Sequence, residues 1–159
     1  MRGTWRVLTA VVSTTMVVGA CASADESSFT SLPAADAQAR EWVDAAVTGA
    51  VPGATAADGH SEGPDSCTSS ADFSEMSYSL SADVPAAEVD TAVALVWQGF
   101  RDQGFGTTTA GTTPAPPGPG SPSFTVNLFH DGFQVEITGA RRTPTYVSTY
   151  IITPCLRTA

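Results

Sequence analysis

Hydrophobic residues recur every three or four positions in two stretches of the chain, which is the spacing of one face of an α-helix. The first stretch begins at Pro33, a residue tolerated in the first helical turn, and ends at Gly49 and the following Val51-Pro52-Gly53. Its apolar stripe consists of Ala35, Ala39, Trp42, Val43 and Ala46. Asp36, Arg40, Glu41 and Asp44 fall mostly on the other faces.

The second stretch begins at Asp83-Val84-Pro85 and predicts the clearer helix. Gly104 follows it as a residue that can adopt the left-handed conformation common at helix ends, and Phe105 stands where a hydrophobic contact often accompanies that conformation. The apolar stripe consists of Val89, Val93, Val96 and Phe100, widened by Ala92 and Trp97.

A period of two, typical of a half-buried β-strand, appears in most of the remaining segments. Residues 67–82 end in an alternation of apolar residues with serines, although Phe73 breaks the phase and indicates a bulge or a late strand start. Residues 124–129 and 133–138 flank His130-Asp131-Gly132, and Asp-Gly between alternating runs is a strong hairpin signal. Strands are also predicted over residues 105–110 and 146–153.

Two segments show neither period, and we predict that both are exposed loops. Residues 53–66 are rich in glycine, alanine and acidic side chains. Residues 111–122 contain five prolines and three glycines, which exclude a helix or a central strand. The alternative for residues 111–122 is a polyproline ligand for a partner domain.

The predicted order is helix, strand, helix and then three or four strands joined by hairpins. Consecutive hairpins imply antiparallel pairing, and helices segregated onto one face of such a sheet form a two-layer sandwich. We therefore predict one α+β domain over residues 33–159, with two helices packed on one face of a mostly antiparallel sheet of four to five strands.

The N-terminal residues carry the features of an export signal. Arg2 and Arg6 precede an uncharged, mostly apolar run of about twelve residues, which suits a signal peptide and is too short to span a bilayer. Val18-Gly19-Ala20-Cys21 resembles the lipobox of bacterial lipoproteins. The resemblance implies a signal peptide of residues 1–20, lipidation of Cys21, and attachment to the extracytoplasmic face of the cell membrane. An ordinary secretory signal followed by a chance cysteine is the alternative.

Residues 22–32 are mostly small and polar, so we predict that residues 21–32 form the lipidated cysteine and a flexible tether. Without Arg2 and Arg6, the mature chain has five arginines against 16 acidic residues, a net charge of −11. This charge argues against binding to nucleic acid or to anionic headgroups. The chain has no lysine, and its abundant alanine, threonine, glycine and aspartate resemble actinobacterial proteins; with the lipobox, it resembles their small lipoproteins.

Cys67 and Cys155 remain once Cys21 is assigned to the lipid. An even number of cysteines in an exported chain predicts one disulfide, whereas no neighbouring histidine pair supports the rival interpretation of a metal site or reactive thiol. The bond would link the start of the 67–82 strand to the end of the 146–153 strand. We therefore expect these two strands to lie side by side and antiparallel.

One short motif resembles a catalytic sequence. Gly59-His60-Ser61-Glu62-Gly63 matches the G-x-S-x-G turn that exposes the nucleophilic serine of α/β-hydrolases, but neither a buried strand before it nor a helix after it is predicted. The acidic side chains around it lack the spacing of a calcium loop, so we expect a solvated loop and no metal or other cofactor. The residues of this segment that could bind a cation are Asp58, His60, Glu62 and Asp65.

Three further groups have a structural and a functional interpretation. We expect Glu136 to lie on the outer face of its hairpin with Gln134 and Thr138; the alternative is a catalytic carboxylate. Arg141-Arg142 is expected to solvate a turn, although it could grip a carboxylate or phosphate. The remaining large aromatic residues are expected to pack the helices on the sheet rather than line an apolar pocket; they are Trp42, Trp97, Phe100, Tyr146 and Tyr150.

These observations together indicate a non-enzymatic envelope lipoprotein. Its domain is expected to bind another envelope protein through loops 53–66 and 111–122 or through an exposed sheet face. The alternative is a carrier that holds a small apolar ligand between the helices and the sheet, and a small hydrolase is a distant third. The sequence names neither the partner nor the oligomeric state.

Overall fold

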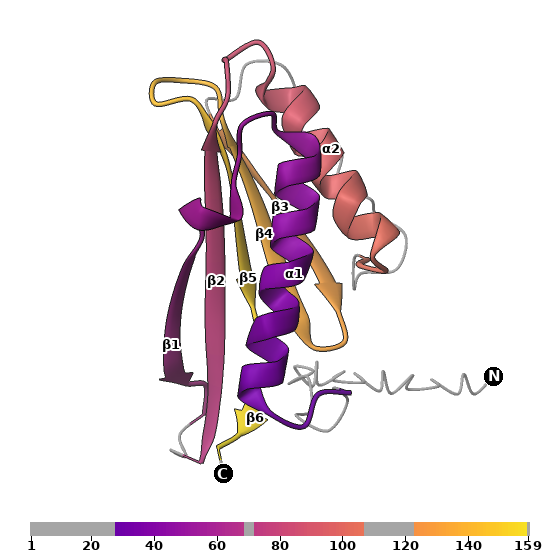
Figure 1. Cartoon of the computed structure of the whole chain (residues 1–159), viewed down its shortest axis with the longest axis vertical. Helices are drawn as coiled ribbons and strands as arrows, with labels where there is room; N and C mark the ends of the chain where they lie inside the picture. The colour runs from indigo at the N-terminus through magenta and orange to yellow at the C-terminus, as the bar shows by residue number, and fades with distance from the viewer. Residues whose placement is uncertain (1–27, 69–71, 107–122, 159) are drawn as a thin grey trace, which may run out of the picture.

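The computed structural model describes residues 28–68, 72–106 and 123–158. Two helices, α1 (Leu32–Ala50) and α2 (Val89–Asp102), lie on one face of a six-stranded sheet, which confirms the two-layer α+β prediction (Figure 1). The strands are β1 (His60–Ser66), β2 (Phe73–Asp83), β3 (Ser123–His130), β4 (Phe133–Ala140), β5 (Tyr146–Ile152) and β6 (Leu156–Arg157). The predicted signal peptide, Cys21 and the 111–122 segment lie outside the described residues.

The main path of the sheet runs in the order β1-β2-β5-β4-β3, and all of its strand pairs are antiparallel. The short strand β6 pairs with the start of β2. The β2–β5 ladder extends from Ser77 opposite Ile152 to Asp83 opposite Tyr146. β2 and β5 therefore lie side by side and antiparallel, as the positions of the two cysteines predicted.

The core lies between the two helices and the inner side of the sheet. Both helices bury the apolar stripe expected of them, except that Trp42 and Trp97 are only partly buried. Gly104 has a φ of +93°, and the Phe105 amide donates to the carbonyl of Phe100, so this helix end forms as predicted. The largest side chains that are fully buried are Phe100, Phe105, Phe133, Leu80, Leu128, Ile137 and Ile151.

The β3–β4 hairpin closes through two residues in the left-handed region. Asp131 has a φ of 48° and Gly132 a φ of 81°, while His130 and Phe133 face each other as the last strand pair. Two consecutive positive φ angles are the geometry of a type I′ turn, whose twist matches that of the flanking strands. The Asp-Gly hairpin prediction is confirmed.

Several predicted boundaries are wrong. Residues 53–66 are not a loop throughout, because they contain a 3₁₀ turn (Ala56–Asp58) and the strand β1. The strand predicted from residue 67 begins at Phe73, where the broken alternation had indicated a late start. The helix predicted from residue 83 begins at Val89, after a turn in which Glu88 donates its amide to the carbonyl of Pro85. Of the strand predicted over 105–110, the described part shows one bridge, between Gly106 and Phe129.

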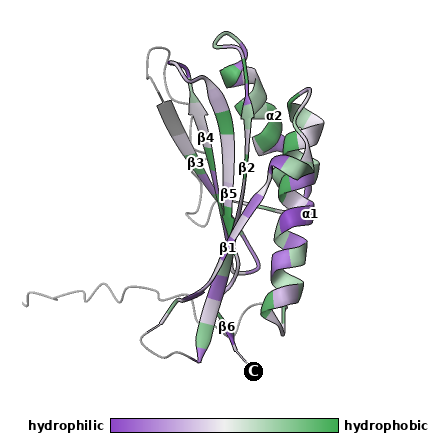
Figure 2. Cartoon of the chain, turned by 60° about the vertical axis from the view of Figure 1, so that its left-hand side comes forward, coloured by the Kyte–Doolittle hydropathy of each residue, from purple (hydrophilic) through white to green (hydrophobic). Residues whose placement is uncertain are grey.

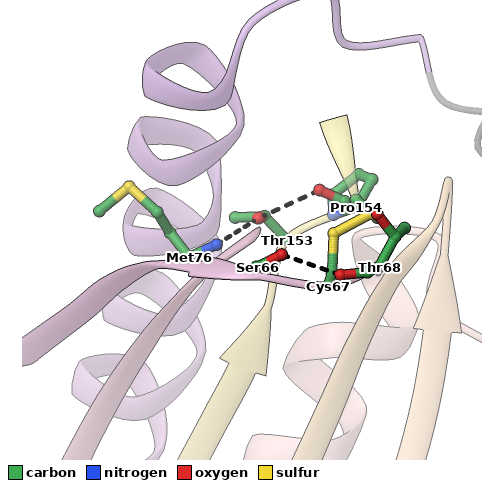
Figure 3. The surroundings of a disulfide bond; sticks show 7 residues. Ser66, Cys67, Thr68, Met76, Thr153 and Pro154 are labelled. Atoms are coloured by element: carbon green, nitrogen blue, oxygen red, sulfur yellow. Dashed lines mark hydrogen bonds between the residues drawn. A yellow bond between two sulfur atoms is a disulfide. The ribbon is translucent and has the colours of Figure 1, made fainter. Parts of the chain in front are cut away.

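Cys67 and Cys155 form the predicted disulfide, with their Cα atoms 6.0 Å apart. Figure 3 shows the bond beside Thr153, whose hydroxyl accepts a 2.9 Å hydrogen bond from the amide of Met76. The amide of Thr153 in turn donates to the carbonyl of Met76, which extends the β2–β5 pairing beyond Ile152. The disulfide therefore joins the chain at the end of the sheet where β1 and β5 end and β2 begins.

Part of the predicted tether is held against the domain. The amide of Ser28 lies 3.0 Å from Oδ1 of Asp131, in the β3–β4 turn, and the ring of Phe29 packs edge-on against Phe133 with ring centroids 5.2 Å apart. Leu32 already belongs to α1. The tether predicted over residues 22–32 therefore extends too far, because the chain is held against the domain from Ser28 onward. None of the described helices has the length and apolarity needed to cross a bilayer.

Candidate interaction surface

We call the side of the sheet that faces away from α1 and α2 the outer face. Figure 2 shows the sheet and the two helices as separate layers, with both helices on the same side. Successive side chains of a strand point to opposite faces, so the residues between the buried ones project outward. The outward positions of β2, β5 and β4 are Glu75, Ser77, Ser79, Ser81, Asp83, Tyr146, Ser148, Tyr150, Ile152, Gln134, Glu136 and Thr138.

Tyr150 stands at the centre of the outer face. The strand registers place it between Ser79 of β2 and Glu136 of β4, with His60 and Asn127 at the two ends of this row. Tyr150 is 38% exposed, although it lies on the central strand of the main path of the sheet. Tyrosine offers a broad apolar ring with a polar hydroxyl and is enriched at protein interfaces.

Hydroxyl groups flank Tyr150 toward the end of the sheet that carries the β4–β5 turn. The hydroxyl of Ser81 donates to that of Ser148 over 2.7 Å, and the hydroxyls of Thr125 and Thr138 lie 3.1 Å apart. These side chains are ordered by their neighbours across the strands. A partner that binds them therefore loses less side-chain entropy than one that must order free side chains.

Negative charge dominates the outer face. The sequences of β1, β2, β3, β4 and β5 contain no lysine or arginine. Burial, and secondly the nearby carboxylate of Asp65, raise the pKa of Glu75 above its ordinary value. The five strands project the carboxylates of Glu62, Asp65, Glu75, Asp83 and Glu136.

Two side chains that can carry positive charge, His60 and Arg157, lie at the margin of the sheet. Nε2 of His60 lies 3.6 Å from Oε1 of Glu62, which is an ion pair only when the imidazole is protonated. Arg157 of β6 places its guanidinium over the ring of Phe73, 5.5 Å from the ring centroid. The middle of the outer face therefore has carboxylates and hydroxyls without a matching cation on its own strands.

The serine motif does not form a nucleophile elbow. Ser61 lies within the edge strand β1, pairs with Tyr78, and is followed by strand rather than helix. His130 ends β3 at the opposite edge of the sheet, four strand spacings away, which is about 19 Å. His60 projects to the other face from Ser61 because the two residues are adjacent in a strand. Neither histidine of the chain is therefore placed to act as a base for Ser61.

The acidic residues considered for a cation are spread along one exposed edge. Asp58 accepts a 2.8 Å hydrogen bond from Thr55 in the 3₁₀ turn, while Glu62 and Asp65 lie on either side of a bulge in β1. Within the part of the chain that the structure describes, no group of three or more potential ligands is arranged to hold a metal ion.

The other candidate residues separate into different environments. Glu136 lies on the outer face with Gln134 and Thr138, as predicted. Arg141 does not simply solvate its turn, because its side chain is only 16% exposed and its Nε lies 2.7 Å from Oδ1 of Asp90, at the start of α2. Arg142 is exposed.

The five aromatic residues do not share one layer. Phe100 is fully buried, and Trp42 packs edge-on against Phe105 with ring centroids 5.1 Å apart. Trp97 is partly buried beside the core. Tyr146 and Tyr150 lie on the outer face, so the expectation that they pack under the helices is wrong.

A groove of about 350 Å³ opens at one end of the helix–sheet core, between the C-terminal end of α1 and the N-terminal end of α2. Leu95, which is 52% exposed, lies on its rim with Glu88. Its apolar wall is lined by Ala50, Val51, Pro52, Val84, Pro85 and Ala92.

Comparison with known proteins adds no family to this description. No protein-family model, curated protein or solved structure matches the chain. The function is therefore inferred from the residues and geometry of this chain.

Proposed function

We propose that this chain is a lipid-anchored envelope protein whose domain is a non-catalytic module that binds a cationic protein surface through the outer face. The observation that carries the proposal is the outer face itself: Glu136 lies beside the exposed Tyr150, four further carboxylates project from β1 and β2, and no strand from β1 to β5 supplies a lysine or arginine. Complementary charge accelerates encounter with such a partner and disfavours acidic ones.

The size of the outer face supports a protein partner. Five strands spaced by about 4.8 Å, with a rise of about 3.3 Å over seven or eight residues, give a surface of roughly 600 Å². That approaches the roughly 800 Å² per partner of a standard interface and falls in the range of transient complexes. A regulated or reversible partner therefore suits this surface better than a permanent subunit.

Two observations support the membrane anchor. The resemblance of Val18-Gly19-Ala20-Cys21 to a lipobox supports lipidation of Cys21, and the Cys67–Cys155 disulfide suits a domain outside the cytoplasm. Two or more acyl chains on one cysteine suffice for stable attachment to a bilayer.

The carrier alternative receives less support. Val96 of α2 and Ile137 of β4 are both fully buried and belong to one continuous core. The groove between α1 and α2 opens at the end of this core, which it meets at Val51, Val84 and Ala92. A ligand between the layers would require the helices to move away from the sheet.

Site-specific photo-crosslinking in the producing cell tests the proposal. A photoreactive phenylalanine analogue replaces Tyr150, and a matched control places it at Gln98, an exposed position on α2. We expect position 150 to crosslink one polypeptide with a basic surface, in a yield that falls at high salt, and position 98 not to do so. Equal yields at both positions, or a salt-independent crosslink to an acidic protein, would contradict the proposal.

A variant that lacks three carboxylates of the outer face tests whether their charge is required for the crosslink. Glu62→Gln, Glu75→Gln and Glu136→Gln together remove three carboxylates without changing the shape of the outer face. We expect this triple variant to reduce the crosslink at position 150 severalfold. The matched control Glu41→Gln changes an exposed carboxylate of α1 and should leave the yield unchanged.

A further inference from the structure

The chain is fastened to the hairpin tip before it enters α1. The amide of Ser28 donates to both carboxylate oxygens of Asp131, at 3.0 and 3.2 Å, and its hydroxyl donates to Oδ2 of the same residue. The ring of Phe29 meets those of Phe133 and Trp42 edge-on, with centroid distances of 5.2 and 6.4 Å. Polar and aromatic contacts thus hold two consecutive residues, which we name the strap.

The strap shortens the distance that the N-terminal segment can span. Seven residue steps separate Cys21 from Ser28, and an extended chain spans at most about 3.6 Å per residue, or about 25 Å here. A tether free as far as Leu32 would add four steps, or about 14 Å. The strap therefore keeps the β3–β4 turn within about 25 Å of the acylated cysteine.

The opposite end of the domain is held well away from this point. β4 begins beside the β3–β4 turn and ends at Ala140, so the seven residue steps along it separate the two ends by about 23 Å. Asp83 faces Tyr146 across the β2–β5 ladder, and Val84 donates its amide to the carbonyl of Thr145. The β4–β5 turn and the start of the β2–α2 connection therefore share the end that is distant from the strap, as Figure 1 shows.

We infer that the strap orients the domain on the bilayer, so that the β3–β4 turn faces the lipid surface and the 141–145 turn points away from it. The strands then run broadly along the membrane normal, and the outer face is open to a partner that approaches from the side. The inference rests on the lipidation of Cys21 in the proposed function. It adds which end of the domain meets the membrane and which residues decide it.

A reconstituted sample tests this orientation without depending on lipidation in the cell. The protein is produced as a chain that begins at Cys21, and its other two cysteines form the disulfide, so a maleimide-functionalised lipid couples only to Cys21. The product is placed in phosphatidylcholine nanodiscs that contain a gadolinium-chelating lipid. The paramagnetic broadening of each backbone amide then reports its distance from the bilayer surface.

We expect the amides of Asp131 and Gly132 to broaden roughly tenfold more than those of Arg142 and Thr143, because the effect falls steeply over the length of β4. The double variant Ser28→Pro with Phe29→Ala removes the donor N–H, the hydroxyl and the ring without changing the hairpin. In that variant the difference between the two ends should fall to less than threefold.

The matched control Glu88→Ala changes an exposed side chain at the distant end and should retain the wild-type gradient. Equal broadening at both ends of the wild-type chain, or an unchanged gradient in the strap variant, would overturn the inference. Since the lipid is attached chemically, either result leaves the lipidation of Cys21 untouched. A cellular chain that lacks acyl groups would instead contradict the anchor and not the geometry of the strap.

Discussion

The hydroxyl of Tyr78 in β2 donates a 2.7 Å hydrogen bond to Oδ1 of Asp44 in α1. Arg40, one turn earlier on α1, lies with its guanidinium 5.5 Å from the centroid of the Tyr78 ring and 2.8 Å from Oδ2 of Asp36. Asp36 is only 9% exposed. Charged and polar groups spaced by one helical turn therefore join α1 to β2 near the edge formed by β1.

Loss of the Tyr78 hydroxyl is expected to weaken the fold. Hydrogen bonds to charged groups contribute about 1.5–3 kcal/mol to stability, and Asp44 is partly solvated, so Tyr78→Phe should lower the free energy of unfolding by about 1–2 kcal/mol. Urea unfolding measures this change. Tyr150→Phe is the control, because its ring lies on the outer face, and an equal loss in both variants would contradict the role of the Asp44 bond.

The pH dependence of stability follows from the same residue. Burial, and then the hydrogen bond from its hydroxyl to Asp44, raise the pKa of Tyr78 from 10.0 to about 12. The protonated hydroxyl therefore stabilises the folded state fully below pH 10, and this contribution is lost as the pH rises through about 12. Tyrosinate absorbance at 295 nm should show a late step that Tyr78→Phe removes; a titration complete by pH 10.5 in the folded wild type would contradict the burial.

Gly59 makes room for the Tyr78 side chain. A Cβ at position 59 would lie 1.7 Å from the Tyr78 hydroxyl oxygen, so Gly59→Ala should displace the ring and cost about 1–3 kcal/mol. Gly49→Ala is the matched control, because nothing lies within 4 Å of its Cβ position and alanine favours a helix by about 0.5–1 kcal/mol. Thermal unfolding should therefore shift in opposite directions for the two variants.

The disulfide is expected to stabilise the domain strongly. Cys67 and Cys155 are 88 residues apart, and closing a loop of that size contributes about 4–5 kcal/mol in the chain-entropy model. The double variant Cys67→Ser with Cys155→Ser should therefore lose at least about 3 kcal/mol in urea unfolding. A reducing agent should destabilise the wild type similarly and leave the double variant unchanged.

The sequence predicted the elements that bury a periodic apolar stripe. The apolar stripe of the second helix and the β3–β4 hairpin formed as the pattern predicted, although the helix begins at Val89 rather than at residue 83. Burial there depends on the local periodicity that the sequence displays. The prediction failed for β1, whose residues are nearly all exposed and which joins the sheet through backbone pairing with β2. A strand without a buried face has no side-chain period to detect.

The outer face was hard to predict for a different reason. Thr149 is fully buried between Leu80 and Ile137, whereas Tyr150 is exposed. In β5 the polar residue therefore faces the core and the aromatic one faces outward, which is the reverse of the usual preference. Tertiary packing set the phase of this strand. Asp36 was likewise not predictable from the local pattern. It was expected away from the apolar stripe of its helix, but it is buried and pairs with Arg40.

A native mass spectrum of the protein, extracted gently from its own membrane, tests the central claim most directly. The account predicts a chain that begins at Cys21, carries acyl groups, contains one disulfide and dissociates on activation from a second, basic polypeptide. The triple variant Glu62→Gln, Glu75→Gln and Glu136→Gln should retain the acyl groups and lose the partner. An unacylated chain would contradict the anchor, and a complex that survives the loss of these carboxylates would contradict the outer face as the binding surface.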